Sequence, residues 1–389
     1  MSGPLEGLRI IEVSAFVAAP LAGLTLAQLG AEVIRIDPVG GNIDTTRWPI
    51  TAEGKSLFWS GLNKGKKSVE LDIRHPDGQE LATQLICAPG ANAGILLTNL
   101  PARGWMSYER LRERREDLIM MRLTGNYDGS TAVDYTVNCA SGFPNATGPS
   151  DDPVNHVLPV WDVSSGLYLA LGILTAERVR RQTGKGQSVS LALSDVMLST
   201  VANLGYVGDV QLNGVSRGPQ GNYLYGAFGR DFQTRDGRRL MIAAISQRQW
   251  RAIGEATGLT ERLGLIGPLM EVDLDDEGGR YLARYAIAAV VESWVGERDY
   301  SQVEGAFSGT GVLWGPYQTF GELVMDDPRC SSLNPLFDDV EHQDIGSILT
   351  PRVPLAYSGS VVPEALASHA VGADTNEVLS WLDGLSGRG

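Results

Sequence analysis

The chain has 389 residues, of which 32 are Lys or Arg and 46 are Asp or Glu, so its formal net charge is −14 at pH 7. That balance argues against nucleic acid as a partner, because binding to a phosphate backbone depends on clustered Lys and Arg. The composition, 43% apolar and 20% charged, is that of a globular protein. The sequence contains no run of about 18 apolar residues, so we expect no membrane association through a spanning helix.

The use of cysteine and histidine indicates a cytoplasmic protein without a bound metal. Cys87, Cys139 and Cys330 are widely spaced and form no Cys-x-x-Cys pair. Reduced thiols are therefore favoured over a zinc site or a disulfide framework. Residues 1–7 lack a basic segment followed by an apolar run, so no secretory signal is expected. The four histidines are not spaced as a metal pair.

Short apolar runs alternate with helical segments over the first 125 residues. Such alternation predicts an α/β fold with a parallel sheet that helices cover on both faces. The expected strands are 8–13, 32–36, 94–98 and 118–123, and the expected helices are 21–29, 76–86 and 108–115.

A long helix is expected next, over 164–181, with Ser164 or Ser165 as its cap. An apolar run from Val189 follows it. Residues 213–229 are rich in Gly, Pro, Asn and Tyr and are interpreted as a linker or a binding loop. The turn 235–238, Arg-Asp-Gly-Arg, predicts a hairpin, and charge-rich helices and a final helix over 377–385 follow.

Several well-known signatures fail on inspection. Residues 61–68 resemble a P-loop but are one residue short between the glycines, and Lys67 replaces the magnesium-binding hydroxyl. This basic segment could hold phosphate groups or form a solvated loop. Residues 273–278 resemble a calcium loop, but Arg284 occupies the position of the final Glu, so a solvated acidic turn is expected. No Gly-x-Ser-x-Gly elbow occurs, which disfavours serine hydrolysis.

Asp162 stands immediately before the predicted long helix. The helix dipole and free N–H groups at that end would stabilise its anion. An ionised carboxylate can attack an activated acyl group. The alternative is that Asp162 only caps the helix, and the residue pattern by itself favours the cap.

Four segments together identify a family resemblance. They are 4–10, 26–36, the Asn-x-x-Lys-Lys-Ser segment with its Leu-Asp at 63–72, and Thr-Gly-Lys-Gly-Gln at 183–187. In these segments, and over nearly the whole chain, the sequence resembles the class III CoA-transferases. That family includes formyl-CoA and carnitine-CoA transferases and alpha-methylacyl-CoA racemase.

The resemblance implies a fold, a substrate and a nucleophile. A large Rossmann-like domain would comprise 1–200 and 330–389, with a linker at 201–228 and a smaller central α+β domain at 229–329. Two ring-like subunits would interlock as a homodimer. The substrate would be an acyl-CoA, with no cofactor beyond its CoA moiety. In the transferases an aspartate before the long helix attacks the thioester, and by position this residue is Asp162.

The resemblance also implies contacts to CoA, although each of these polar residues could equally be an ordinary surface group. Leu71 and Arg74 match positions that line the CoA cleft. Asn99 matches an asparagine that follows an acid in the family, where this chain has Thr98. The expected phosphate partners are basic residues: Arg47, Lys66 and Arg103.

Two departures narrow the implied activity. Val133 stands where the racemases have a catalytic histidine, so one arm of a two-base proton shuttle is absent. The mobile tetraglycine loop of formyl-CoA transferases is also absent, and 217–225 occupies the comparable region.

Segments 133–138, 155–159 and 221–232 most resemble members that move CoA between the two carboxyl groups of one mesaconate. Arginine suits bidentate carboxylate binding, and tyrosines can wall a small pocket. The residues expected to hold the free carboxylate are Tyr135, Arg217, Tyr223, Tyr225 and Arg230. Three alternatives remain open: a transferase that uses a free dicarboxylic acid, a racemase, and a CoA-binding protein without catalysis.

Overall fold

The computed structural model describes residues 3–386, which form two compact units. The first unit contains the described residues of Met1–Ser141, His156–Val215 and Pro328–Gly389, and the second contains Gly142–Asn155 and Ser216–Asp327. Residues 142–155, expected in the large domain, and 216–228, expected in the linker, therefore group with the second unit. Each unit is described by itself below.

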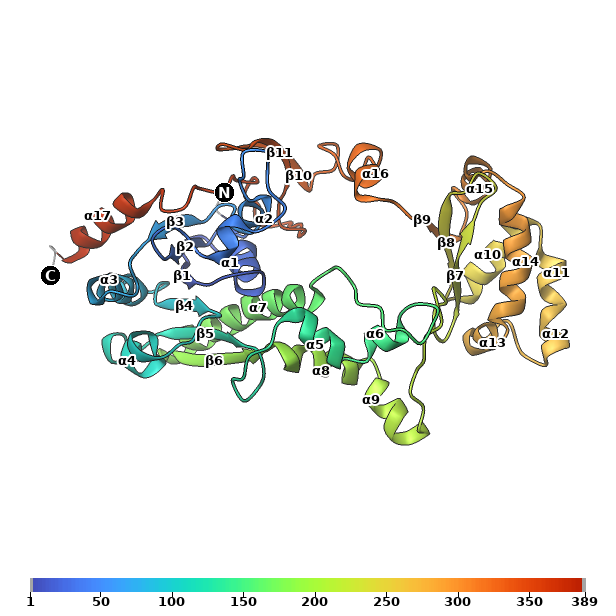
Figure 1. Cartoon of the computed structure of the whole chain (residues 1–389), viewed down its shortest axis with the longest axis horizontal. Helices are drawn as coiled ribbons and strands as arrows, with labels where there is room; N and C mark the ends of the chain where they lie inside the picture. The colour runs from blue at the N-terminus through green and yellow to red at the C-terminus, as the bar shows by residue number, and fades with distance from the viewer. Residues whose placement is uncertain (1–2, 387–389) are drawn as a thin grey trace. The chain divides into compact units, whose positions relative to one another are not determined.

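A six-stranded parallel sheet forms the centre of the first unit, in the order β3-β2-β1-β4-β5-β6 (Figure 1). The order reverses between β1 and β4, so the loops that follow these two strands diverge at the carboxyl edge of the sheet. Ligands of open α/β folds bind at this switch point. The strands are β1 Arg9–Val13, β2 Glu32–Asp37, β3 Lys67–Glu70, β4 Ile95–Thr98, β5 Ile119–Thr124 and β6 Gln187–Ala192.

The apolar strands of the first half are confirmed to within one residue of their predicted bounds. Their branched apolar side chains are buried, as expected for parallel strands covered on both faces. The prediction missed β3, because Lys67 and Glu70 at its ends give it a charged sequence. Val69 is buried in its centre, and Lys67 pairs with Glu32 and Glu377.

Helices pack on both faces of this sheet, and the last of them, α17, lies beside β3 (Figure 1). An antiparallel hairpin of β10 Phe337–His342 and β11 Gly346–Pro351 also belongs to this unit. The helices are α1 Ala18–Gln28, η1 Ile43–Thr46, α2 Leu57–Leu62, α3 Pro76–Cys87, η2 Gly104–Met106, α4 Tyr108–Arg114, α5 Asp134–Ala140, α7 Val160–Thr183, α8 Leu193–Asn203, α9 Tyr206–Gly208, η3 Asp209–Asn213 and α17 Thr375–Ser386. Within residues 3–386, no helix has the length and apolar character needed to cross a membrane.

The long helix α7 begins at Val160, four residues before its predicted start, so Ser164 and Ser165 lie inside the helix and not at its cap. It crosses α1 closely at Gly166, where a Cβ atom would stand 2.8 Å from the Ala18 carbonyl oxygen. Glycine therefore allows the first turns of α7 to lie against the start of α1, which follows directly from β1. This crossing brings the first turn of α7 to the carboxyl edge of the sheet.

The second unit is built on a three-stranded antiparallel sheet in the order β7-β8-β9. The predicted hairpin is confirmed: β7 and β8 pair on either side of a turn in which Gly237 has φ +84°. Phe228, Phe232, Trp294 and Phe307 contribute to its apolar core. The elements are α6 Phe143–Ala146, β7 Phe228–Gln233, β8 Arg239–Ala244, α10 Gln247–Thr257, α11 Thr260–Gly264, α12 Ile266–Met270, α13 Glu277–Leu282, α14 Arg284–Gly296, α15 Tyr300–Phe307, β9 Leu313–Pro316 and α16 Phe320–Met325.

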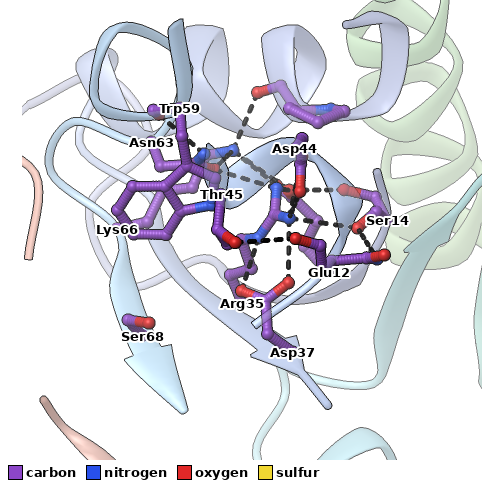
Figure 2. Close-up of polar contacts among 12 residues, drawn as sticks. Glu12, Ser14, Arg35, Asp37, Asp44, Thr45, Trp59, Asn63, Lys66 and Ser68 are labelled. Carbon is purple, nitrogen blue, oxygen red and sulfur yellow. Dashed lines mark hydrogen bonds and ion pairs between the residues drawn. The ribbon is translucent and has the colours of Figure 1, made fainter. Parts of the chain in front are cut away.

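A buried ion network centred on Arg35 fixes the loop that follows β1 (Figure 2). The guanidinium, 1% exposed, donates to both oxygens of Asp37 at 2.8 and 2.9 Å, to Asp44 and to the Ser14 carbonyl oxygen. Burial opposes the charge, but the hydrogen bonds and charges of the carboxylates raise the pKa of Arg35 above its ordinary value. Asp44 in turn accepts a hydrogen bond from the N–H of Phe16, at 3.1 Å.

Lys66 belongs to the same network, which argues against its predicted contact with a phosphate group. It is 2% exposed, and its ammonium donates to Glu12, the Pro20 carbonyl oxygen and Asn63 at 3.0, 2.8 and 3.0 Å (Figure 2). Burial lowers the pKa of Lys66 to about 8. Three acceptors thus face its three N–H groups, and the residue holds the fold together at this position.

We predict that Arg35→Ala lowers the free energy of unfolding by about 3–5 kcal/mol, because Asp37 and Asp44 would remain buried without their partner. Urea denaturation followed by circular dichroism measures the change. Arg114→Ala is the matched control, since its pair with Glu80 is solvent-exposed and should contribute less than about 1 kcal/mol. Equal effects of the two substitutions would contradict the structural role of the network.

Candidate active site

At the switch point, one side chain joins the loops that follow β1 and β4. Asn99, directly after β4, accepts from the N–H of Ala15 at 3.0 Å and donates to the carbonyl oxygen of Ala15 at 2.7 Å. Phe16, which follows Ala15, has φ +66°, a left-handed conformation that is strained for a residue with a bulky side chain. Asn99 and Asp44 therefore hold a strained loop at the edge where ligands of such folds bind.

Asp162 is the third residue of α7, in the first turn of the helix and partly buried. Burial raises the pKa of its carboxyl group to about 6, the charge of Asp134 adds to the rise, and the charge of Arg47 opposes it. Burial therefore outweighs the stabilisation of the anion that the helix end is expected to give. About nine-tenths of the carboxyl groups are still ionised at pH 7.

Two N–H groups in the first turn of α7 donate to the carboxylate of Asp134. Oδ2 of Asp134, the first residue of α5, accepts from the N–H groups of Trp161 and Asp162 at 2.7 and 3.1 Å. One turn later on α5, Asn138 accepts from Nε1 of Trp161 at 3.1 Å. Among the described residues, none donates a hydrogen bond to the Asp162 carboxylate.

This arrangement argues against the interpretation of Asp162 as a helix cap, and its role as a nucleophile stays a prediction. The first turn of α7 is capped by Asp134, so Asp162 does not serve as the cap. Its carboxylate is partly buried, is mostly ionised and accepts no hydrogen bond from the part of the chain that the structure describes. An ionised carboxylate can attack an acyl group.

Sequence reasoning missed Asp134 and Asn138. Their spacing, four residues apart on one short helix, was visible as a polar pair on one face. Nothing in the sequence indicated that this face meets Trp161, more than twenty residues further along the chain.

The other predicted residues of the first unit fall into two groups. Leu71 is buried, and the amide of Asn99 is engaged by Ala15, so these two shape the edge of the sheet. The remaining residues are exposed and could reach a ligand: Arg47, Arg74, Arg103 and Tyr135. Arg47 stacks over the rings of Phe16 and Phe58, with its guanidinium carbon 5.5 and 5.0 Å from their centroids.

The predicted residues of the second unit form a cluster of arginine–tyrosine contacts. Arg217 lies over the ring of Tyr225, at 3.3 Å from the centroid. Arg230 donates to the hydroxyl of Tyr223 at 3.1 Å and pairs with the exposed Glu292 at 2.9 Å. The structure therefore pairs Arg217 with Tyr225 and Arg230 with Tyr223 within this unit, where guanidinium groups could bind a carboxylate.

The first-unit residues combine a carboxylate with a nearby positive charge. Among residues 3–386, no three His, Cys, Asp or Glu side chains gather in a group that could hold a metal ion. Asp162 supplies the carboxylate, and Arg47 supplies positive charge near it. These groups suit nucleophilic attack on an activated carbonyl carbon.

Comparison with known proteins gives one consistent result. Residues 5–375 match the model of CoA-transferase family III. The chain is 52% identical to 2-methylfumaryl-CoA isomerase of Chloroflexus aurantiacus, over 99% of this chain and 95% of that protein. It is 28% identical to succinyl-CoA:mesaconate CoA-transferase of Haloarcula hispanica, over 97% and 99% of the two chains. A CAIB/BAIF family protein from Brucella suis has the same fold, with a TM-score of 0.80 and 24% identity over 98% and 100% of the chains.

We predict that Asp162→Asn stabilises the protein in a pH-dependent way. Since the pKa of Asp162 is raised in the folded state, the wild type loses stability as the pH rises from the unfolded value near 4 to about 6, and no more above that. Asparagine stays neutral, so the gap in Tm should open between about pH 4 and 6 and then stay constant. Thermal unfolding over pH 4–9 measures it, and a gap of the same size at every pH would contradict the raised pKa.

Proposed function

We propose that this chain, which belongs to CoA-transferase family III, moves CoA within one molecule of substrate, from the C1 to the C4 carboxyl group of mesaconate. The product of 2-methylfumaryl-CoA would be 3-methylfumaryl-CoA. The observation that carries the proposal is the carboxylate of Asp162, held in the first turn of α7 but not used to cap it. The similarity to an isomerase of this name supports the choice of substrate.

The first half of the reaction moves CoA from substrate to enzyme. The Asp162 carboxylate attacks the C1 thioester carbon, the C–S bond breaks, and CoA thiolate leaves a mixed aspartyl–mesaconyl anhydride. The thiolate then attacks the aspartyl carbonyl carbon. The anhydride C–O bond breaks, which gives an aspartyl-CoA thioester and bound mesaconate.

The second half reverses these two steps at the other carboxyl group. The C4 carboxylate attacks the aspartyl thioester and expels the thiolate, which forms the anhydride at C4. The thiolate attacks the C4 carbonyl carbon and releases the C4 thioester and the free Asp162 carboxylate. One thioester is broken and one is made, so the equilibrium should lie within roughly 1–2 kcal/mol of balance.

The steps transfer acyl groups between oxygen and sulfur and leave every oxidation state unchanged. We therefore propose no cofactor beyond the CoA moiety of the substrate itself. Two exposed basic residues of the first unit, Arg47 and Arg103, are the proposed partners of the CoA phosphates, and Arg74 is proposed to line the CoA cleft.

Intramolecular transfer requires that mesaconate stay bound while its two ends exchange. Reactants held together can reach effective molarities of roughly 10⁵ M or more, so a site that retains mesaconate needs no free acid. We assign retention to side chains that can bind or surround a carboxylate: Tyr135, Arg217, Tyr223, Tyr225 and Arg230. Support comes from the arginine–tyrosine contacts of the second unit.

The proposed assembly is an interlocked homodimer located in the cytoplasm. Apolar side chains are exposed along α7 and α16, among them Leu167, Leu171, Phe320 and Met325. Exposed apolar surface of this kind commonly marks an interface. The three cysteines are free thiols, as a reducing compartment would keep them.

Incubation with mesaconyl-C1-CoA and isotopically labelled free mesaconate tests the function directly. We expect the C4 isomer to form without label, as chromatography with mass detection would show. Label in the product would support the second candidate, a transferase that uses a free dicarboxylic acid. That candidate is suggested by the similarity to a succinyl-CoA:mesaconate CoA-transferase. If neither isomer changes, both candidates fail.

We predict that Asp162→Ala lowers kcat by at least about 10³-fold, because no other group on this turn can form the anhydride. Mass spectrometry of the wild type quenched with hydroxylamine should detect a modified Asp162, since hydroxylamine cleaves activated aspartyl groups. Arg178→Ala, an exposed residue near the far end of α7, is the control and should behave as the wild type. Normal activity of Asp162→Ala would refute the mechanism.

We predict that Arg217→Ala raises KM by roughly tenfold, the usual effect of removing a charged hydrogen-bonding partner, and allows labelled mesaconate to enter the product. Steady-state kinetics with the labelled acid measures both effects. Arg217→Lys should restore part of the affinity. If Arg217→Ala and Arg230→Ala both kept normal kinetics, the assignment of these residues to the carboxylate would be wrong.

A further inference from the structure

We infer that Asp134 is a positioning residue for the nucleophile, because it caps the first turn of α7, where the N-cap residue Pro159 makes no side-chain cap, and so holds the backbone N–H of Asp162. This inference rests on the proposed function of Asp162. It adds a residue for which neither the sequence pattern nor the family resemblance indicated a role.

The geometry of the cap carries the argument. The first N–H groups of a helix have no partner within the helix, and the side chain of the N-cap residue ordinarily accepts from those of the second and third helical residues. In α7 the N-cap residue is Pro159, which makes no side-chain cap. In this structure one oxygen of Asp134 accepts from two of these groups, at 2.7 and 3.1 Å. Asp134 is 1% exposed, so water cannot replace it at the helix end. Asp134 therefore supplies the cap that Pro159 lacks, and it holds the N–H of Asp162 itself.

A second contact fixes the distance between the two helices. Asn138, fully buried one turn along α5, accepts from the indole nitrogen of Trp161 at 3.1 Å. Trp161 itself is buried and precedes Asp162 directly. Asp134 therefore holds the backbone N–H groups of Trp161 and Asp162, and Asn138 holds the side chain of Trp161. Both contacts restrain the position of the nucleophile.

The charges around Asp162 show why this cap also affects reactivity. A carboxylate cap brings a negative charge towards the nucleophile, whereas Arg47 brings a positive one. The helix α1, which packs closely on α7, contains no titratable residue, and Arg122 of β5 and Asp195 of α8 are not among the groups that shift the pKa of Asp162. Removal of the Asp134 charge should make Asp162 less basic, and a less basic carboxylate is a weaker nucleophile.

Asp134→Asn separates the electrostatic effect from the geometric one, because the amide oxygen can still accept both hydrogen bonds. We expect the acid limb of kcat/KM, near pH 6 in the wild type, to move down by roughly 1 pH unit. We expect Asp134→Ala, which loses both bonds, to lower kcat by roughly 10²-fold through misplacement of Asp162. Asp117→Asn, the same exchange before the amino end of β5, is the control and should leave the limb in place.

A merely structural role predicts that Asp134→Asn lowers activity equally at every pH and leaves the limb near pH 6. That outcome would overturn the inference. A shift of the limb to higher pH would overturn it as well, because it has the wrong sign for the loss of a negative charge.

Thermal unfolding tests the same coupling without an activity assay. The change in Tm that Asp162→Asn causes is measured over pH 4–9, once in the wild-type background and once in the Asp134→Asn background. We expect this change to be smaller and to open at lower pH when Asp134 is replaced, and identical changes in the two backgrounds would contradict the inference. If Asp162→Asn keeps full activity, the proposed function fails, while this measurement still decides whether Asp134 acts on Asp162.

Discussion

The carboxylate of Asp134 is the contact on which the proposed chemistry of this protein depends. It accepts hydrogen bonds from two N–H groups at the start of α7 and thereby caps the helix. The N-cap residue of α7, Pro159, makes no side-chain cap of its own. The cap supplied from α5 therefore fixes the backbone of Asp162.

Opposing influences act on Asp162, and their balance sets its charge. The helix dipole and Arg47 favour the anion, while burial and Asp134 disfavour it, and the second pair prevails. The resulting pKa of about 6 leaves the carboxylate ionised near neutral pH but more basic than an exposed aspartate. Such a group attacks a thioester more readily and is still a usable leaving group when the anhydride breaks.

Buried polar contacts hold the loop after β1, at the edge of the sheet near this carboxylate. Arg35 and Lys66 are cations buried among Glu12, Asp37 and Asp44, and this network holds the loop after β1 (Figure 2). Asn99 clamps the same loop from β4. Arg35 and Lys66 therefore stabilise the fold. Arg47, stacked on two aromatic rings, remains exposed near Asp162.

The sequence by itself determined the parallel strands, the hairpin of the second unit and the identity of the candidate nucleophile. Strand and turn formation follow from local apolar patterning and from Gly237, and Asp162 was located by its place in a family motif. The tertiary structure alone decided that β3 is a strand despite its charges, that Lys66 is buried, and that Asp134 caps α7. These features depend on contacts between residues far apart in the chain, and a burial or pKa that such contacts create leaves no local pattern in the sequence.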